Sequence, residues 1–518
     1  MVKYLDNNSG FAQWNAMRTE KKPSKFFGFF WWLLLFLFAW WIMGAWFKPK
    51  DVVVENNQPV VTVEQSNVAK RNVPAKEISF DVQGLRISNV SLNEHFKDSK
   101  SKEKIALLAG ENNFIEIGFT SADVQTPNIN TNWELKSDMM HWNAGGGVHF
   151  SRQILVDGYV LTIVDTIKNN SSREISFTPY IRMLSGSESQ MASVVETGGV
   201  VYANSKLDYT SWKKLNKKSV AYSTVRGTLG FAEQYWETLA AMDANDQTIS
   251  LKKTGDLYSA QTNAVPVKVA AKSEHTINTY VFAGPRMSNV LKTAENKIPG
   301  ITQTMDYGWF WFFAQPMLWM LNWLFALVGN YGVAIILMTI ILRVLIWPLT
   351  RKSFVSTMKM QQMQPELQRV QKLYANDKAR LQVEMMRVYQ THRTSPMAGC
   401  LPMLIQIPIF FALYKALLIS VPMRSAHFLW ISDLAVMDPY FILPILMGAT
   451  MWLQQHLQTS KPQTNTSDVM ASTQRVMKWM PVLFTFMFAW MPAGLVLYWT
   501  VSNLFGILQM YIIKKNAK

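Results

Sequence analysis

The chain has 518 residues, of which 49% are hydrophobic, with 20 tryptophans, one cysteine and a formal net charge of +16. This length allows two or three domains, and the single cysteine excludes an internal disulfide. The charge does not indicate a specific DNA-binding protein, because residues 48–306 are nearly neutral, with about 28 Lys/Arg against about 27 Asp/Glu. Nearly all of the basic excess lies in the remainder, beside apolar segments.

The N-terminal region predicts a membrane anchor. Residues 1–25 are polar and basic, and we expect them to form a cytoplasmic N-terminal extension. Residues 26–47 carry no charge and are long enough to span a bilayer as a helix. A cleavable signal peptide has a shorter apolar region and a small-residue cleavage site. Neither is evident, so residues 26–47 are predicted to be an uncleaved first transmembrane anchor.

Residues 48–306 are predicted to form an antiparallel β domain on the outer side of the membrane. Apolar and polar residues alternate repeatedly, with Asn/Gly/Ser/Asp loops between the runs, and this pattern suits a β sandwich. The clearest runs are 60–65, 77–90, 114–119, 159–167, 173–184 and 275–284. A helical pattern returns only around 289–297.

The segment 309–328 is long enough to span, but we predict an interfacial helix there instead. If it crossed the bilayer, the basic loop 350–399 would lie outside, against the positive-inside bias. Gln315, Pro316 and Asn322 also interrupt its apolar run. Residues 307–330 are therefore expected to form an amphipathic helix in the outer interface.

The rest of the chain completes a six-span membrane protein with both termini in the cytoplasm, according to apolar length and the placement of basic residues. The predicted segments are a second span (331–349), a cytoplasmic helical hairpin (350–399), a third span (400–421), a fourth span (440–456), a polar cytoplasmic loop (457–479), a fifth span (480–491), a sixth span (493–513) and a cytoplasmic tail (514–518).

The predicted hairpin has a methionine-rich apolar face that suits variable apolar partners, although ordinary packing between its two helices explains the same pattern. Asn376-Asp377 is the expected turn, and the basic charge suits anionic lipid or ribosomal RNA. The candidate recognition residues are Met358, Met360, Met363, Met385 and Met386.

Arg343 is the most informative residue, because it lies inside the second span and the later spans contain no Asp or Glu. Charge at this depth is costly and marks a functional site by default. One interpretation is that Arg343 reaches the inner headgroups. The other is a polar groove that is open to the cytoplasm. Each polar residue that would line this groove can also be explained, taken singly, by hydrogen bonding between helices. These candidates are Thr339, Trp347, Gln406, Thr485, Tyr498, Ser502 and Asn503.

Lys415 is a second cation within a predicted span, and we expect it to reach the outer interface. Motifs for nucleophilic, phosphate-binding or zinc chemistry are missing from the sequence, and the β-domain histidines lack metal-ligand spacing. We therefore expect no catalytic residues, no metal and no cofactor, and the chain is not predicted to be an enzyme.

Several motifs resemble one known family. The runs ILRVLIWPLTRKS (341–353), MAGCLPMLIQIPIFFALY (397–414), DPYFILPILMG (438–448) and MPAGLVLYWTVSNL (491–504) are similar to those of the YidC membrane protein insertases. TLGFAEQYWET (228–238) looks like the periplasmic domain of the Gram-negative type. The resemblance implies a bacterial inner-membrane protein with a periplasmic β-supersandwich and a five-helix core that holds a hydrophilic groove. It places Arg343, Thr339, Gln406 and Trp499 at groove-lining positions.

The resemblance also implies the function. We expect an insertase and chaperone that receives nascent or short membrane proteins and releases their apolar segments sideways into the lipid bilayer. The expected partners are the Sec translocon, the ribosome and the signal-recognition-particle receptor. Two alternatives remain open at this point. One is a secondary transporter or channel, which requires ionisable relays. The other is a membrane-tethered carbohydrate-binding protein, which requires a pocket with convergent carboxyl or imidazole groups.

Overall fold

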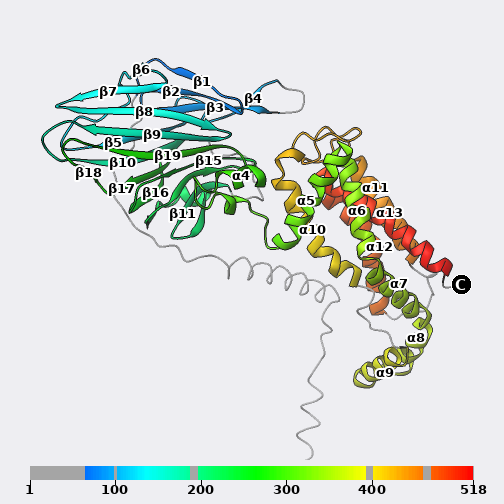
Figure 1. Cartoon of the computed structure of the whole chain (residues 1–518). Coiled ribbons are helices and arrows are strands. Elements are labelled where there is room, and N and C mark those ends of the chain that lie inside the picture. Colours follow the sequence, from blue (N-terminus) through cyan, green and yellow to red (C-terminus); the bar gives the residue numbers. More distant parts are fainter. Residues whose placement is uncertain (1–64, 98–101, 187–196, 393–400, 459–467, 517–518) are drawn as a thin grey trace, which may run out of the picture. The chain divides into compact units, whose positions relative to one another are not determined.

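The computed structural model describes residues 65–97, 102–186, 197–392, 401–458 and 468–516, all within one compact unit. The predicted N-terminal extension (1–25) and first anchor (26–47) lie outside the described residues. Figure 1 shows an all-β domain followed along the chain by a group of helices.

The β domain consists of two antiparallel sheets that share one hydrophobic core (Figure 1). The first sheet has the order β1 (Arg71–Pro74), β2 (Ile78–Gln83), β3 (Arg86–Phe96), β5 (Phe114–Thr120), β10 (Ile175–Ser185), β17 (Leu257–Ala264), β16 (Gln247–Thr254), β13 (Val220–Thr224), with β4 (Lys104–Leu107) on β3 and β18 (Val267–Val269) on β10. The second has the order β12 (Lys206–Ser211), β11 (Gly198–Ala203), β14 (Thr228–Ala232), β15 (Trp236–Met242), β19 (Ser273–Pro285), β9 (Val160–Asn169), β8 (Val148–Asp157), β7 (Met139–Gly145), β6 (Glu134–Lys136).

Strand formation follows the alternation in the sequence where one face of a sheet is buried. Buried and half-buried residues alternate along β2 and along most of β10, as the predicted runs require. In β14 and β15, by contrast, every residue is buried, so these strands show no alternation. The predicted β sandwich is confirmed, and it contains more strands than the six clearest runs indicate.

A buried polar network fixes the C-terminal end of the β domain, which also contains α3 (Trp212–Leu215), α4 (Ser288–Ala294) and the 3-10 turn η1 (Ile301–Thr304). Arg286 Nε lies 3.5 Å from a carboxylate oxygen of Glu237, and Thr304 Oγ1 donates to the other oxygen at 3.0 Å. Arg286 also donates to the hydroxyl of Tyr209 at 2.9 Å and to the Thr304 carbonyl. The network therefore joins β12, β15 and η1 through Arg286, the residue that follows β19.

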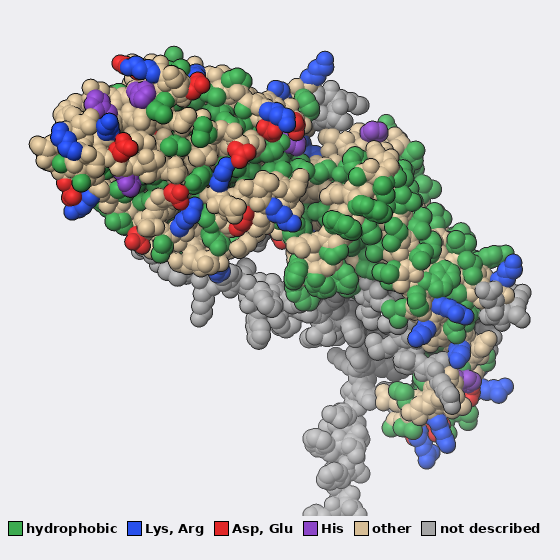
Figure 2. Space-filling model, viewed as in Figure 1, with side chains coloured by type: hydrophobic (Ala, Val, Ile, Leu, Met, Phe, Trp, Pro, Cys, Tyr) green, Lys and Arg blue, Asp and Glu red, His purple; other side chains and the backbone are tan. Residues whose placement is uncertain are grey.

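The helices after residue 306 begin with α5 (Trp311–Val328) and α6 (Tyr331–Leu345). The others are α7 (Trp347–Gln362), α8 (Gln364–Leu373), α9 (Lys378–Thr391), α10 (Leu401–Ile419), the 3-10 turn η2 (Val421–Met423), α11 (Ile442–Gln458), α12 (Asp468–Phe488) and α13 (Ala493–Asn516). Side chains from α5, α6, α10, α11, α12 and α13 share one hydrophobic core. Hydrophobic side chains also cover much of the visible outer surface of these helices (Figure 2).

Two described helices, Trp311–Val328 and Ala493–Lys515, are long and apolar enough to cross a membrane by length and composition. The pair Tyr331–Leu345 and Trp347–Met360 passes the same test together, but it is bent by 65°. The six spans and the interfacial placement of 307–330 thus stay predictions. One face of α5 is buried by Ala314, Met317, Leu318, Leu321 and Leu324, and tryptophans stand on its exposed face.

Several predicted boundaries differ from the structure. The second span was expected to run through 331–349, but α6 ends at Leu345 and α7 begins at Trp347. Pro348 lacks an amide hydrogen and crowds the carbonyl four residues before it, which favours a break at this point. The loop expected over 457–479 is shorter, because α11 continues to Gln458 and α12 already begins at Asp468.

The hairpin is present with the predicted turn. Asp377 caps α9 by accepting a hydrogen bond from the Arg380 amide at 3.0 Å. Its first arm is divided into α7 and α8. The last residues of the predicted hairpin, 393–399, lie outside the described residues.

Polar contacts join the β domain to α10. The Lys415 ammonium pairs with the carboxylate of Asp306, and Gln234 Nε2 donates to the carbonyl of Leu418 at 2.9 Å. Lys415 was expected to reach headgroups, and instead it has an acidic partner at the end of the β domain. Leu318, Ala416, Ile419 and Val421 also extend the core of the β domain.

We predict that Arg286→Ala destabilises the protein in a pH-dependent way. Burial raises the pKa of Glu237 from 4.5 to about 7, although Arg286 and Thr304 oppose that shift. The folded state therefore holds this proton more tightly than the unfolded state. The resulting stability is fully present below pH 4.5 and is lost as the pH rises through about 7. Removing Arg286 leaves an ionised Glu237 without its partner, so the loss of stability should be largest in alkaline buffer, about 3–5 kcal/mol.

Unfolding of the full-length protein in detergent micelles, followed by near-ultraviolet circular dichroism at about pH 5 and about pH 8, measures this difference. The matched control is Arg286→Ala combined with Glu237→Gln, which should remove most of the pH dependence. An equal loss at both pH values in the single variant would contradict the prediction.

Candidate functional site

Arg343 lies in the last turn of α6, directly before the bend into α7. The helix starts cleanly, because Asn330 caps it by accepting a hydrogen bond from the Val333 amide at 3.2 Å. From there the apolar sequence continues to Leu342 and gives the helix its buried face. Arg343 thus follows a long apolar stretch and is half-buried itself.

The guanidinium of Arg343 is held by a hydroxyl and not by a carboxylate. Its Nε donates to Ser502 Oγ at 2.7 Å, and its Nη2 donates to the same oxygen. Ser502 belongs to α13 and is only 1% exposed. A guanidinium has five N–H donors, which is more than one hydroxyl oxygen can accept hydrogen bonds from. Among the described residues, Arg343 has no ion pair with an acid.

A second polar contact lies one helical turn away on α13. Gln406 Nε2 in α10 donates to the hydroxyl of Tyr498 at 2.6 Å, and Tyr498 itself is buried. Tyr498 and Ser502 are four residues apart and share a face of α13. The structure thus brings Arg343, Gln406, Tyr498 and Ser502 together, from three helices, as one polar cluster.

Three other candidates lie elsewhere or face their own helix. Thr339 is fully buried, and its hydroxyl donates a hydrogen bond to the carbonyl of Ile335 at 2.6 Å. Thr485 Oγ1 donates to the carbonyl of Pro481 at 2.8 Å. Asn503 donates to Thr450 Oγ1 in α11 at 3.3 Å. These bonds match the helix-internal and helix–helix interpretation that the sequence left open.

The two tryptophan candidates pack against aromatic rings. Trp499 contacts Phe410, Phe484 and Phe488, with ring centroids 5.5, 6.1 and 5.1 Å away. Trp347, at the start of α7, meets Phe505 of α13 edge to face at 6.4 Å. Trp499 therefore forms an apolar surface with residues of α10 and α12. In the sequence it directly follows Tyr498, a member of the polar cluster.

The hairpin methionines have different environments. Met363 is 1% exposed and forms a small core with Leu367 and Val388, and Met385 packs against this core. Met358 and Met360 lie half-buried on α7, and Met386 is 51% exposed. Leu373 and Val383 are still more exposed, at 75% and 65%, and the methionine pattern did not identify them. Exposed basic residues occur on the same helices, and Figure 2 shows Lys and Arg gathered there.

The β domain offers no metal centre in its described part, where no group of three or more His, Cys, Asp or Glu side chains is placed to hold an ion. An all-β domain followed by a bundle of apolar helices, with a half-buried arginine among them, defines a membrane protein with a large extramembrane domain.

Comparison with known families names the particular class. The family described as 60Kd inner membrane protein matches residues 323–518, and the YidC periplasmic domain family matches residues 72–320. The membrane protein insertase YidC of Magnetococcus marinus is 32% identical over 490 residues, covering 89% of this chain and 86% of its own length. The insertase YidC of Rickettsia conorii is 31% identical over 513 residues, covering 89% and 90%. The chain belongs to the YidC family of membrane protein insertases, and the predicted family and function are confirmed.

Solved structures show more distant similarities. A crystal structure of an active YidC insertase covers 86% of this chain and 94% of its own, with 19% identity and a TM-score of 0.38. A galactose mutarotase related enzyme from Lactobacillus acidophilus covers 42% of this chain and 97% of its own, with 8% identity and a TM-score of 0.30. A likeness this remote says nothing about sugar chemistry in this chain. Insertases are not catalytic enzymes, in agreement with the expectation from the sequence.

We predict that Gly448→Ala loosens the packing of α11 on α12. A Cβ at Gly448 would lie 1.9 Å from Thr485 Oγ1, a distance that real contacts do not reach. Overpacking of this kind costs about 1–3 kcal/mol, and combining it with Thr485→Ala should recover part of the loss. Thermal unfolding in detergent measures both.

The matched control is Gly506→Ala in α13. There the added Cβ would meet the end of the Gln454 side chain at 2.8 Å, and a flexible end can move away. If the Gly448 and Gly506 variants lose the same stability, close packing against Thr485 is not the cause.

Proposed function

We propose that the polar cluster around Arg343 forms one wall of a hydrophilic groove that receives the segment to be translocated. The single observation that supports this is the bonding of Arg343 to a serine hydroxyl, without a carboxylate partner among the described residues. Arginine stays protonated even when it is desolvated. An acidic side chain in the incoming segment supplies the charge partner that the bundle lacks.

The attraction is strong because of where it acts. Two unit charges about 4 Å apart interact by roughly 1 kcal/mol in water, and by about 4 kcal/mol at the effective dielectric near a protein surface. The interaction is transient, since water again solvates the acidic residue after translocation. A polar groove that reaches partway into the bilayer also shortens the apolar path for this residue.

The apolar part of the substrate leaves sideways along α10 and α12. Val482, Leu483 and Phe486 of α12 are each at least 59% exposed, and they offer a continuous apolar face. Transfer into lipid stabilises the substrate helix by about 25 cal/mol for each Å² of apolar surface removed from water. Hydrophobic partitioning thus drives release, with no covalent step.

The hairpin receives the chain on the cytoplasmic side. Leu373, Val383 and Met386 provide exposed apolar contacts beside basic residues that suit anionic lipid or ribosomal RNA. By family resemblance, the partners are nascent membrane proteins, the ribosome, the signal-recognition-particle receptor and the Sec translocon.

The protein resides in the bacterial inner membrane with its β domain in the periplasm and both termini in the cytoplasm. In this arrangement α5 lies in the outer interface, with its tryptophan-rich face among the headgroups. The same placement puts Arg343 toward the cytoplasmic side of the bilayer. No specific observation favours a transporter or channel.

Arg343→Glu is expected to reduce insertion of substrates with acidic translocated segments by about tenfold or more, because attraction becomes repulsion. Arg343→Lys retains the charge and should keep most of the activity. Protease protection of a radiolabelled substrate in proteoliposomes measures insertion. A substrate whose translocated segment is neutral should be much less affected, and this difference separates charge attraction from misfolding.

A matched control is Arg351→Glu, which reverses an exposed charge on α7 outside the polar cluster. Normal insertion of acidic substrates by the Arg343→Glu protein would contradict the proposed charge attraction. An equal loss with acidic and neutral substrates would have the same consequence.

A further inference from the structure

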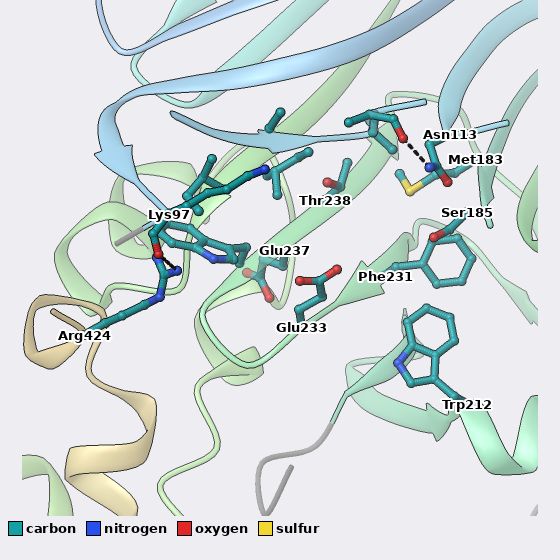
Figure 3. Close-up of a pocket in the computed structure, with 16 residues that line it drawn as sticks. Lys97, Asn113, Met183, Ser185, Trp212, Phe231, Glu233, Glu237, Thr238 and Arg424 are labelled. Carbon is teal, nitrogen blue, oxygen red and sulfur yellow. Dashed lines mark hydrogen bonds between the residues drawn. The ribbon is translucent and has the colours of Figure 1, made fainter. Parts of the chain in front are cut away.

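A cavity of about 410 Å³ opens where the β domain meets the chain that follows α10. Strands β4, β10, β14 and β15 contribute to its walls, and Arg424 reaches its rim from the residue directly after η2 (Figure 3). Pockets for small ligands usually measure about 300–1,000 Å³ and combine apolar walls with a few convergent polar groups. The charged side chains of this cavity indicate which ligand it fits.

Glu233 brings a carboxyl group without a partner into this cavity. Figure 3 shows its half-buried side chain pointing into the space that the other lining residues enclose. No hydrogen bond or ion pair reaches this carboxyl group from the part of the chain that the structure describes. Burial accordingly raises the pKa of Glu233 above its ordinary value. A cation that enters the cavity would stabilise the ionised carboxylate and lower this pKa again.

Arg424 places a positive charge at the rim of the same cavity. Its Nη1 donates to the Phe96 carbonyl at 3.0 Å, and its Nη2 donates to the Lys97 carbonyl. The guanidinium also lies 5.8 Å from the centre of the Trp236 ring. These contacts fix its position, but they use only part of its N–H donors and supply no negative charge. Since no carboxylate among the described residues pairs with Arg424, its remaining donors are available to an anion.

The other charged residues of the lining already have partners. Glu237 has Arg286 within 3.5 Å, and the Lys97 ammonium has an acidic partner of its own. Glu233 and Arg424 form no ion pair with each other, although both line the cavity. One acid and one base are therefore left to be satisfied by a ligand that lies between them.

A ligand with both charges suits this cavity best. A cation alone would leave Arg424 without a partner, an anion alone would leave Glu233 without one, and a neutral ligand would pair with neither. A zwitterion satisfies both groups. The rings of Phe231 and Trp236 also line the cavity, and the faces of aromatic rings attract an ammonium group.

The position of the rim along the chain indicates the source of such a zwitterion. Arg424 directly follows η2, which itself follows α10. In the placement proposed above, on which this inference rests, the C-terminal end of α10 lies at the outer surface of the bilayer. Headgroup regions add about 10–15 Å to a hydrocarbon core of about 30 Å. The rim therefore lies within reach of the headgroups of the outer leaflet.

We propose that this cavity binds the ethanolamine-phosphate headgroup of a phospholipid. The ammonium group donates to the Glu233 carboxylate and lies against the aromatic rings, and the phosphate accepts from the Arg424 guanidinium. The acyl chains stay in the bilayer beside the helices. A bound headgroup thus ties the β domain to the membrane surface at the outer end of α10.

Native mass spectrometry of the full-length protein tests the proposal, with an equimolar mixture of phosphatidylethanolamine, phosphatidylcholine and phosphatidylglycerol in the detergent. The most tightly held lipid should be phosphatidylethanolamine, by about tenfold or more. Phosphatidylcholine carries the same charges, but its methylated nitrogen has no N–H to donate to Glu233, and phosphatidylglycerol has no ammonium group. Water-soluble glycerophosphoethanolamine is added as a competitor, and tighter binding of this compound than of the lipid would overturn the lipid source.

Variants of the two charged residues identify the site. Glu233→Gln should lower the preference for phosphatidylethanolamine over phosphatidylcholine by about tenfold, without lowering the temperature of unfolding, because the carboxyl group has no partner to lose. Arg424→Gln should weaken the retention of both lipids, and Arg424→Lys, which keeps the charge, should retain most of it. The matched control is Glu134→Gln, which changes an exposed acid on β6 and should bind lipid like the original chain.

Equal retention of the three lipids overturns the proposal, as does an unchanged preference in the Glu233→Gln protein. Displacement of the lipid by a short peptide that binds more tightly would assign the cavity to polypeptide instead. The measurement requires no insertion of a substrate, so its failure would leave the proposed role of Arg343 intact. A failure of the Arg343 variants in the insertion assay would likewise leave lipid binding at Glu233 unaffected.

Discussion

A guanidinium that cannot lose its proton imposes one requirement on the helical bundle, which is that something polar must solvate it. Ser502 meets part of this requirement through its hydroxyl group, and the closely packed contacts of α6 with α13 keep that hydroxyl in place. A hydroxyl accepts hydrogen bonds but carries no charge. The bundle is therefore stable with Arg343 in place and still favours an anion that arrives from outside.

The β domain shows how the same chain treats its other buried arginines. Arg86 lies 2.9 Å from a carboxylate oxygen of Glu116, and Arg152 lies 2.7 Å from one of Asp165. Arg286 has Glu237 within 3.5 Å. Each of these pairs satisfies its own charge, as stability requires. Arg343 differs from them because no acid among the described residues pairs with it, and this difference is the basis of its proposed role toward a substrate.

The sequence was sufficient to predict features that depend on residue type and on the period of apolar residues. It was insufficient for features that depend on the direction a side chain faces or on contacts between residues far apart in the chain. The alternating strands and the isolated charge of Arg343 were predictable. The fully buried strands β14 and β15 have no alternation to detect. Thr339 and Thr485 had suitable chemistry, but a hydroxyl that bonds to its own helix is indistinguishable in sequence from one that faces a groove. The pairing of Lys415 with Asp306 spans 109 residues and follows no local pattern.

Glu233 is the counterpart of Arg343 in the periplasmic domain. Both are titratable groups in poorly solvated surroundings, and neither has an opposite charge among the described residues. Side chains that lack the partner their surroundings would normally require occur most often where a protein binds another molecule. At Arg343 the surroundings are helical and apolar, and in the proposed function the missing partner is an anion on a passing polypeptide. At Glu233 the neighbours are aromatic rings, and burial raises the pKa of its carboxyl group above the ordinary value. The two groups thus share poor solvation, although their surroundings differ.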